Sequence, residues 1–158
     1  MTLFNPSGGD TDFAEVQPGG HELPVLDSLG EVVGVCATHD DVYLRFSYTP
    51  DDSDMSTRRE RESGYLLPGV PAWPLCPEPW WGAGSRTWIA RQLIRHSHLA
   101  YSGIEPWLVS GQVRGRGPDC EPLIAHLTPI ARVGRKALVE ADESYAAWQT
   151  RSFRSLTG

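Results

Sequence analysis

The sequence predicts an α+β fold in which a mostly antiparallel sheet packs against two or three helices. Apolar and polar residues alternate along "DVYLRFSYT", residues 41–49, as they do in a strand with two different faces. Apolar residues recur at helical spacing in "SRTWIARQLIRHSHLA", residues 85–100, and in "RKALVEADESYAAWQTRSF", residues 135–153. Strand-like runs flank the turn "GRGPDC", residues 115–120, which indicates a hairpin.

The chain is predicted to begin with a tail, followed by a single domain. Residues 1–22 are rich in Gly, Pro and Asp, which predicts a flexible tail, and residues 23–158 are expected to form one α+β domain. In "PVLDSLGEVVGVCA", Asp27 stands where an N-cap residue would precede a short helix. In the later helix, residues 85–100, Ser85 has the same predicted role.

The middle of the chain is predicted to lack helices. Residues 50–63, "PDDSDMSTRRERES", form a charged loop that either is solvated or covers a charged ligand as a lid. Prolines then recur through residues 64–84, which excludes a helix and predicts extended segments held by tryptophans. Beyond the next helix, strands are predicted at residues 107–114 and 121–133.

Composition excludes several functional classes. The net charge of −6 argues against sequence-independent nucleic-acid binding, and no apolar run approaches the length of a membrane span. Cys36, Cys76 and Cys120 have no spacing typical of disulfides or zinc, and His96 and His98 are two apart, so no metal site is predicted. Without a signal peptide at the N-terminus, the chain is expected to be soluble and cytoplasmic.

The stretch "GRGPDCEPLI" carries the candidate catalytic residues, Asp119 and Glu121. Residues two apart on an extended chain project to the same side, so the two carboxylates would repel and one could keep its proton or share a cation. Such a group could serve in acid–base catalysis. The alternative is a rigid turn whose charges are neutralised by Arg114 and Arg116.

Arg45 in "YLRFS" is the candidate ligand-binding cation, with Ser47 on the same face of the strand. An arginine in the middle of a strand either faces water or meets an acid, and Asp119 or Glu121 are the candidates. At a cleft, its guanidinium could clamp a phosphate or carboxylate. The sequence therefore predicts a pocket for an anionic or nucleotide-like small molecule near Arg45, Asp119 and Glu121.

Six tryptophans support an alternative function. Trp80 and Trp81 are adjacent in a Pro/Gly-rich segment where both cannot easily be buried, so one, Trp81 for instance, would line a binding site. On this hypothesis residues 68–81 make the protein a non-catalytic binding or protein-interaction module. A homodimeric structural protein is the third hypothesis.

The motifs "YLRFS", "ESGYLLPG", "PEPWW", "WIARQL" and "GRGPDCEPLI" resemble an uncharacterised family of small actinobacterial proteins over most of residues 24–133. The order of elements is also similar to that of ADP-ribosyltransferases. In that resemblance Arg45 would hold the phosphates of NAD, Ser63 would stand in the middle serine motif, and Glu121 with Asp119 would match the catalytic acid. The resemblance implies NAD as the cosubstrate, although "ESGYLLPG" lacks the Ser-Thr-Ser arrangement.

Overall fold

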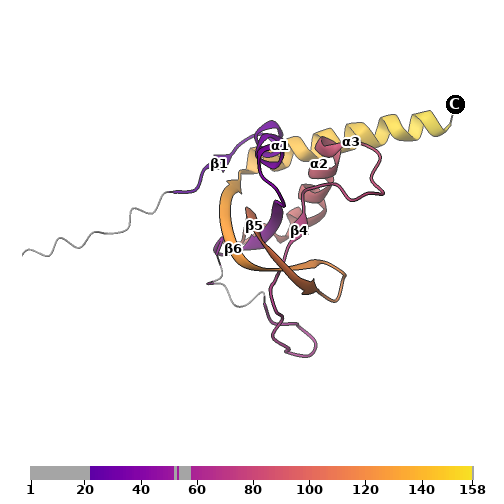
Figure 1. The fold of residues 1–158 in the computed structure, drawn as a ribbon. Coiled ribbons are helices and arrows are strands. Elements are labelled where there is room, and N and C mark those ends of the chain that lie inside the picture. Colours follow the sequence, from indigo (N-terminus) through magenta and orange to yellow (C-terminus); the bar gives the residue numbers. More distant parts are fainter. Residues whose placement is uncertain (1–21, 52, 54–57, 158) are drawn as a thin grey trace, which may run out of the picture.

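The computed structural model describes residues 22–51, 53 and 58–157, so most of the predicted tail lies outside the described residues (Figure 1). The predicted α+β fold is confirmed. The elements, in chain order, are β1 (Val25–Leu26), α1 (Leu29–Thr38), β2 (Tyr43–Ser47), β3 (Val70–Pro71), β4 (Trp73–Pro74), α2 (Ser85–His96), the 3-10 turn η2 (Ser97–Leu99), β5 (Glu105–Arg116), β6 (Pro122–Val133) and α3 (Arg135–Leu156). In this part of the chain, no helix is long and apolar enough to cross a membrane.

The sheet is mixed and mostly antiparallel. Its strand order is β1-β6-β5-β2-β4, and β3 pairs with β6. Among the described strands, only β1 runs parallel to its neighbour. Residues 70–75 connect the two outer sides of this sheet. Ala72 donates its N–H to the Pro122 carbonyl (3.1 Å), and Leu75 donates its N–H to the Val42 carbonyl (3.0 Å). Because one short segment bonds to β6 and then to β2, the sheet closes on itself there.

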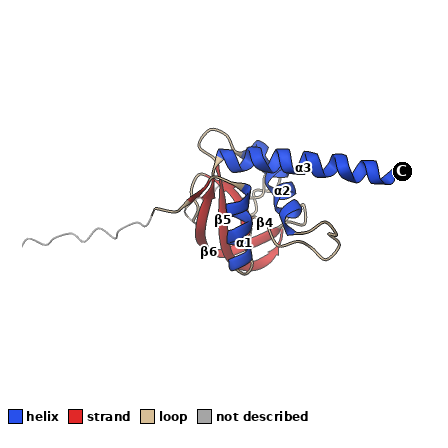
Figure 2. Ribbon diagram, turned by 90° about the horizontal axis from the view of Figure 1, so that it is seen from above, coloured by secondary structure: helices blue, strands red, loops and turns tan. Residues whose placement is uncertain are grey.

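The helices pack against one side of the curled sheet (Figure 2). Leu44 and Phe46 of β2 and Leu108 of β5 belong to the core that the helices share, whereas Tyr43 belongs to a second cluster inside the closed part of the sheet. Both faces of β2 are therefore buried. The main core contains, among others, Leu29, Val32, Leu75, Trp88, Ile89, Leu93, Val133, Ala137 and Ala141.

The predicted N-caps of the first two helices are each displaced by one residue. In α1 the cap is Ser28 and not Asp27, because the Ser28 hydroxyl accepts the Glu31 N–H (3.1 Å) while the Glu31 carboxylate accepts the Ser28 N–H (3.1 Å). In α2 the cap is Gly84, at a φ of 84° that favours glycine, and Ser85 is already helical.

Candidate functional site

Arg45 and Ser47 are placed on the predicted common face of β2, but this face is buried. Each residue is only 1% exposed. The Arg45 guanidinium donates to the Asp51 carbonyl, and the Ser47 hydroxyl donates to the Thr49 carbonyl. Both side chains therefore bond the backbone of the turn that follows β2, a structural arrangement in which neither is open to a ligand.

The acidic turn lies at the other end of the β5–β6 hairpin. Arg45 is opposite Trp107, near the start of β5, whereas Glu121 follows the end of β5 at Arg116. Nine residues of strand separate these two points, which at about 3.3 Å per residue is roughly 30 Å along the strand. Along β5, Arg45 and the turn with Asp119 and Glu121 therefore lie toward opposite ends of the strand.

Within the turn, the Glu121 carboxylate accepts the Asp119 N–H at 2.9 Å, and the Arg116 guanidinium donates to the Cys120 carbonyl at 2.9 Å. Asp119 itself is exposed, while Glu121 is half-buried. These contacts fit the alternative of a rigid, charged turn. The catalytic roles of Asp119 and Glu121, and NAD as a cosubstrate, stay predictions from the sequence.

Ser63 lies in a small hairpin, residues 58–67, that projects from the sheet. Glu60 donates its N–H to the Tyr65 carbonyl (2.8 Å), and its carboxylate accepts both the N–H (2.7 Å) and the hydroxyl (2.6 Å) of Ser63. Hydrogen bonds from the Ser63 hydroxyl and from the backbone N–H groups of Glu62 and Ser63 lower the pKa of Glu60 to about 2. Ser63 therefore holds its own turn together.

Five aromatic rings from three segments form one contiguous patch. Trp80 and Trp81 come from the loop before α2, Trp88 comes from α2, and Tyr145 and Trp148 come from α3. Their ring centroids lie 5.4–5.8 Å apart in successive tilted, edge-on or stacked pairs. We call these five residues, together with Arg91, the aromatic patch.

The aromatic patch is graded from buried to exposed. Trp88 is buried and donates its indole N–H to the Pro74 carbonyl, and Trp81 is half-buried and donates to the Gly84 carbonyl. Trp80 is 61% exposed, and its indole N–H donates to the Glu78 carboxylate. Of the adjacent pair, Trp80 is thus the residue that faces solvent, and Trp81 supports it from beneath.

Arg91 of α2 supplies the charge of the patch. Its guanidinium carbon lies 5.5–5.7 Å from the ring centroids of Trp80, Trp81 and Trp88, within cation–π range of all three. Its one hydrogen bond among the described residues is a long contact of 3.5 Å to the Gln92 side chain. The indoles therefore fix a guanidinium that retains N–H donors for a carboxylate.

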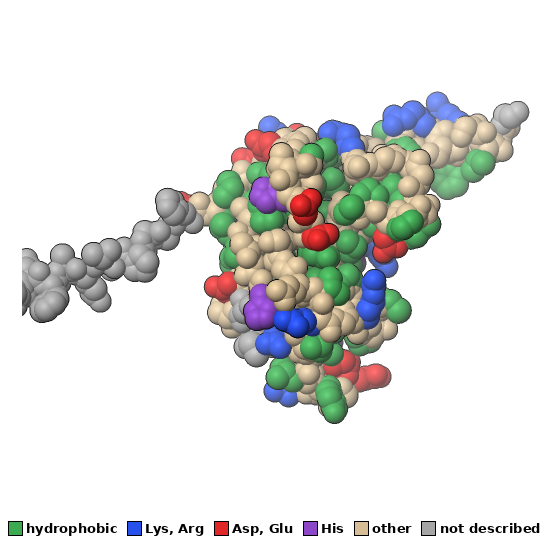
Figure 3. Space-filling view, viewed as in Figure 1, with side chains coloured by type: hydrophobic (Ala, Val, Ile, Leu, Met, Phe, Trp, Pro, Cys, Tyr) green, Lys and Arg blue, Asp and Glu red, His purple; other side chains and the backbone are tan. Residues whose placement is uncertain are grey.

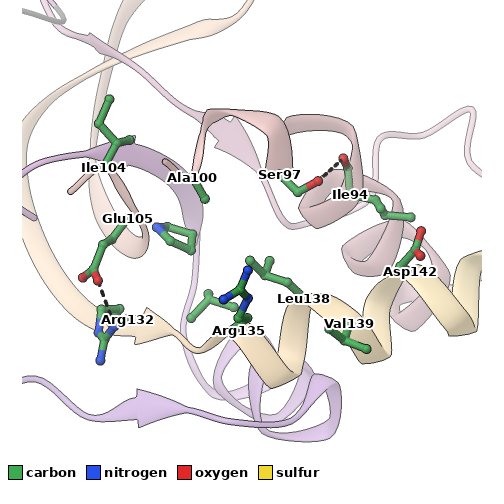
Figure 4. A pocket seen from close by; sticks show the side chains of 12 residues that line it. Ile94, Ser97, Ala100, Ile104, Glu105, Arg132, Arg135, Leu138, Val139 and Asp142 are labelled. Carbon is green, nitrogen blue, oxygen red and sulfur yellow. Dashed lines mark hydrogen bonds and ion pairs between the residues drawn. The ribbon is translucent and has the colours of Figure 1, made fainter. Parts of the chain in front are cut away.

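A second feature is an open cavity of about 610 Å³ beside the start of α3 (Figure 4). Apolar residues of α2, α3 and the turn before β5 form its walls, among them Ile94, Ile104 and Leu138. Its charged residues are Glu105, Arg132, Arg135 and Asp142. Arg132 and Glu105 already form an ion pair (3.0 Å), whereas Arg135 rises from the first turn of α3.

A smaller cavity, about 310 Å³, lies between the end of α1 and the start of α2 and is lined by Cys36 and Cys76. Burial, and then the charge of Cys76, raise the pKa of the Cys36 thiol to about 12, so this thiol is protonated and a poor nucleophile. Among the described residues, no group of three or more His, Cys, Asp or Glu side chains could hold a metal ion.

The sequence profile of one protein family, described as a family of unknown function (DUF6098), matches residues 19–154. The chain belongs to the DUF6098 family. No curated protein and no solved structure matches it. For this DUF6098 protein the expected uncharacterised family is thus shown, while an actinobacterial origin and the likeness to ADP-ribosyltransferases stay predictions.

Sequence reasoning placed Trp80 and Trp81 in a binding segment of this DUF6098 chain but missed two partners. Arg91 and Trp148 were not among the predicted binding residues. A signal was present for Arg91, because it lies three residues after Trp88 and therefore one helical turn from it. The contact of Trp148 with Trp81 joins residues 67 positions apart and had no local signal.

Proposed function

We propose that the protein is a non-catalytic interaction module that binds a protein partner through the aromatic patch. The observation that carries this proposal is the 61% exposure of Trp80 on top of a rigid stack of rings. Trp, Tyr and Arg are the residues most enriched among those that dominate binding energy in protein interfaces. A tryptophan held in place by other rings also loses little conformational entropy on binding.

The chemistry of the patch favours an acidic, partly apolar segment as the partner. The indoles offer apolar area, and the Arg91 guanidinium between them offers N–H donors. A carboxylate on the partner would form a charge-assisted hydrogen bond with Arg91 at the edge of an apolar contact, where such bonds are strong. The net charge of −6 argues against nucleic acid as the partner. We propose that the protein acts in the cytoplasm.

The test starts with a photo-cross-linking amino acid at position 80 of the full chain, expressed in its native host. Tyr65 is the matched control, because it is an aromatic residue that is 76% exposed but lies on the separate hairpin 58–67. We expect one partner to be cross-linked from position 80 and not from position 65. Equal capture at both positions, or none at position 80, would overturn the proposal.

The captured partner is then purified and titrated by calorimetry. We expect Trp80→Ala to weaken binding by about thirtyfold, the effect of a hot spot worth roughly 2 kcal/mol. Arg91→Gln should weaken binding and also reduce its dependence on salt. Tyr65→Ala should leave the affinity unchanged. Equal affinity of the Trp80→Ala variant and the wild type would contradict the proposal even if the partner is genuine.

A further inference from the structure

The second half of α3 projects from the body of the protein (Figures 1 and 2). All residues from Gln149 to Leu156 are exposed except Ser152, which is half-buried. Phe153 and Leu156, which are 68% and 81% exposed, lie on this projecting end. Short helical segments without tertiary contacts are marginal in water, and large exposed apolar side chains are typical of a surface that another molecule covers.

These residues belong to one stripe along α3. Val139, Ala146 and Phe153 follow one another at seven-residue spacing, and Leu156 comes three residues after the last of them. Seven-residue spacing keeps side chains on one face of a helix and is the pattern by which helices pair. All four residues of this stripe are exposed.

The same face of α3 borders the cavity of about 610 Å³. Leu138, Val139 and Asp142 line that cavity at the start of the helix (Figure 4). Phe153 is fourteen residues beyond Val139, or about 21 Å along the helix axis at 1.5 Å per residue. One face of α3 thus borders the cavity near the start of the helix and carries the exposed Phe153 and Leu156 side chains near its end.

We propose that two copies of the chain form a twofold homodimer by pairing their α3 helices antiparallel, with Phe153 and Leu156 of each copy seated against the cavity of the other. With a twofold axis near the middle of the stripe, between Ala146 and Gln149, the projecting end of each α3 helix meets the cavity of the other copy. Such an interface uses the same surface on both copies and therefore closes at two subunits. The apolar wall that includes Ile94 and Ile104 receives the two side chains.

The charged residues beside the stripe favour a second copy of the chain, in antiparallel orientation, as the molecule that covers it. At 100° per residue, Glu143 and Arg154 flank the stripe on the same side, one near each end. Within the described residues, neither side chain forms a hydrogen bond or an ion pair. Figure 3 shows basic side chains on the projecting end beside hydrophobic ones. In an antiparallel pair the same flanks of the two helices face each other, so Glu143 is level with the partner copy's Arg154. In a parallel pair these residues would lie on opposite sides of the seam and would not meet.

The inference goes beyond the proposed function and stands independently of it. Trp148 is on a different side of α3, where it contacts Trp81, so pairing along the stripe leaves the exposed Trp80 and its contacts with Trp81 and Arg91 uncovered. The dimer would then carry two aromatic patches. A partner with two acidic segments, or one that is itself dimeric, would bind with increased avidity.

The test is sedimentation equilibrium of the full chain across the micromolar range, with circular dichroism to confirm folding. We expect the wild type to associate to a dimer. Glu143→Arg and Arg154→Glu should each raise the dimer dissociation constant by about tenfold or more, because each opposes like charges. The double variant exchanges the two charges and should regain wild-type association. Arg151→Glu reverses an exposed charge on the side of the same helix that faces away from the stripe, and it should have no effect.

A wild type that is monomeric at every concentration would overturn the proposal. So would a dimer that both single variants leave intact, or a double variant that stays as weak as the singles, because each of these results excludes the antiparallel register. Phe153→Ser provides a check independent of charge and should also weaken the dimer. Cross-linking from position 80 should be unchanged in Glu143→Arg, so failure of the dimer and failure of the aromatic patch can be told apart.

Discussion

His96, at the end of α2, uses its imidazole as a flat aromatic ring. It stacks on Trp73 with ring centroids 3.7 Å apart and planes 22° apart, and its residue is buried. Burial first, and then the charges of Arg95, His98 and Arg91, lower the pKa of His96 from 6.5 to about 4. The folded protein therefore holds this ring neutral near pH 7.

This pKa predicts a specific dependence of stability on pH. Because the unfolded chain binds a proton at His96 near 6.5 and the folded chain only near 4, the contribution of His96 is complete above 6.5 and is lost as the pH falls toward about 4. Urea unfolding at about pH 7 and about pH 4.5 should show this loss in the wild type and a smaller one in His96→Phe, which keeps the stacking.

His126→Asn is the control for this prediction, because His126 is exposed and is not among the charged groups that lower the pKa of His96. This variant keeps His96 and should keep the loss of stability seen in the wild type. If His96→Phe and the wild type lost stability in parallel between the two pH values, the ring would not be held neutral by folding.

The residue scale also shows where sequence reasoning stopped. The alternation in "YLRFS" placed Arg45 and Ser47 correctly on one face of a strand. Alternation alone could not show that the second face of β2 is also covered, because its cover includes the cluster formed with Val70 and Ile124 from distant segments. A surface clamp was therefore expected where the chain has a buried arginine.

At the scale of elements, the β5–β6 hairpin depends on two glycines that pass close to Ile124. A Cβ at Gly69 would lie 2.7 Å from the Ile124 backbone nitrogen. A Cβ at Gly111 would lie 2.4 Å from Ile124 Cγ2 and 2.8 Å from the Ala125 carbonyl oxygen. These close approaches let the strands curl tightly enough for the sheet to close.

Gly111→Ala should therefore destabilise the protein by about 1–3 kcal/mol, because the added methyl group displaces Ile124 or the backbone beside it. Gly34→Ala is the matched control. Gly34 lies within α1 with nothing within 4 Å of the added atom, so this change should stabilise the protein by roughly 0.5–1 kcal/mol through helix propensity. Chemical denaturation measures both, and effects of the same sign would contradict this account of Gly111.

The elements with strong local patterns were predicted well. The ranges expected for β2, α2, α3 and the last hairpin agree with the structure to within a few residues. The strands β3 and β4 were foreseen only as extended segments, because two-residue strands that contain Pro71 and Pro74 are defined by their distant partners and not by their own sequence. Of the aromatic patch, Trp80 and Trp81 were predicted, whereas the contact of Trp148 with Trp81 was not, because it joins distant segments of the chain.

At the scale of the whole molecule, closure by residues 70–75 should make the sheet unfold as one unit. The Ala72 amide bonds to Pro122 of β6, the Leu75 amide bonds to Val42 directly before β2, and both residues are at most 1% exposed. We expect these two amides to exchange hydrogen only through global unfolding, whereas Arg151 and Arg154 should exchange through local fraying in dilute protein. Amide exchange by NMR with added denaturant separates the two cases, and equal exchange at all four sites would contradict the expectation.

The closure of the sheet by residues 70–75 also affects the tendency of the protein to aggregate at high concentration. A bare strand edge is a template on which another chain can add its backbone, and repeated addition leads to fibrils. Here residues 70–75 occupy the outer sides of both β2 and β6, and the two prolines in that segment have no N–H to offer. At these positions the protein is protected against strand addition, so a second chain that meets it there finds side chains and no free backbone.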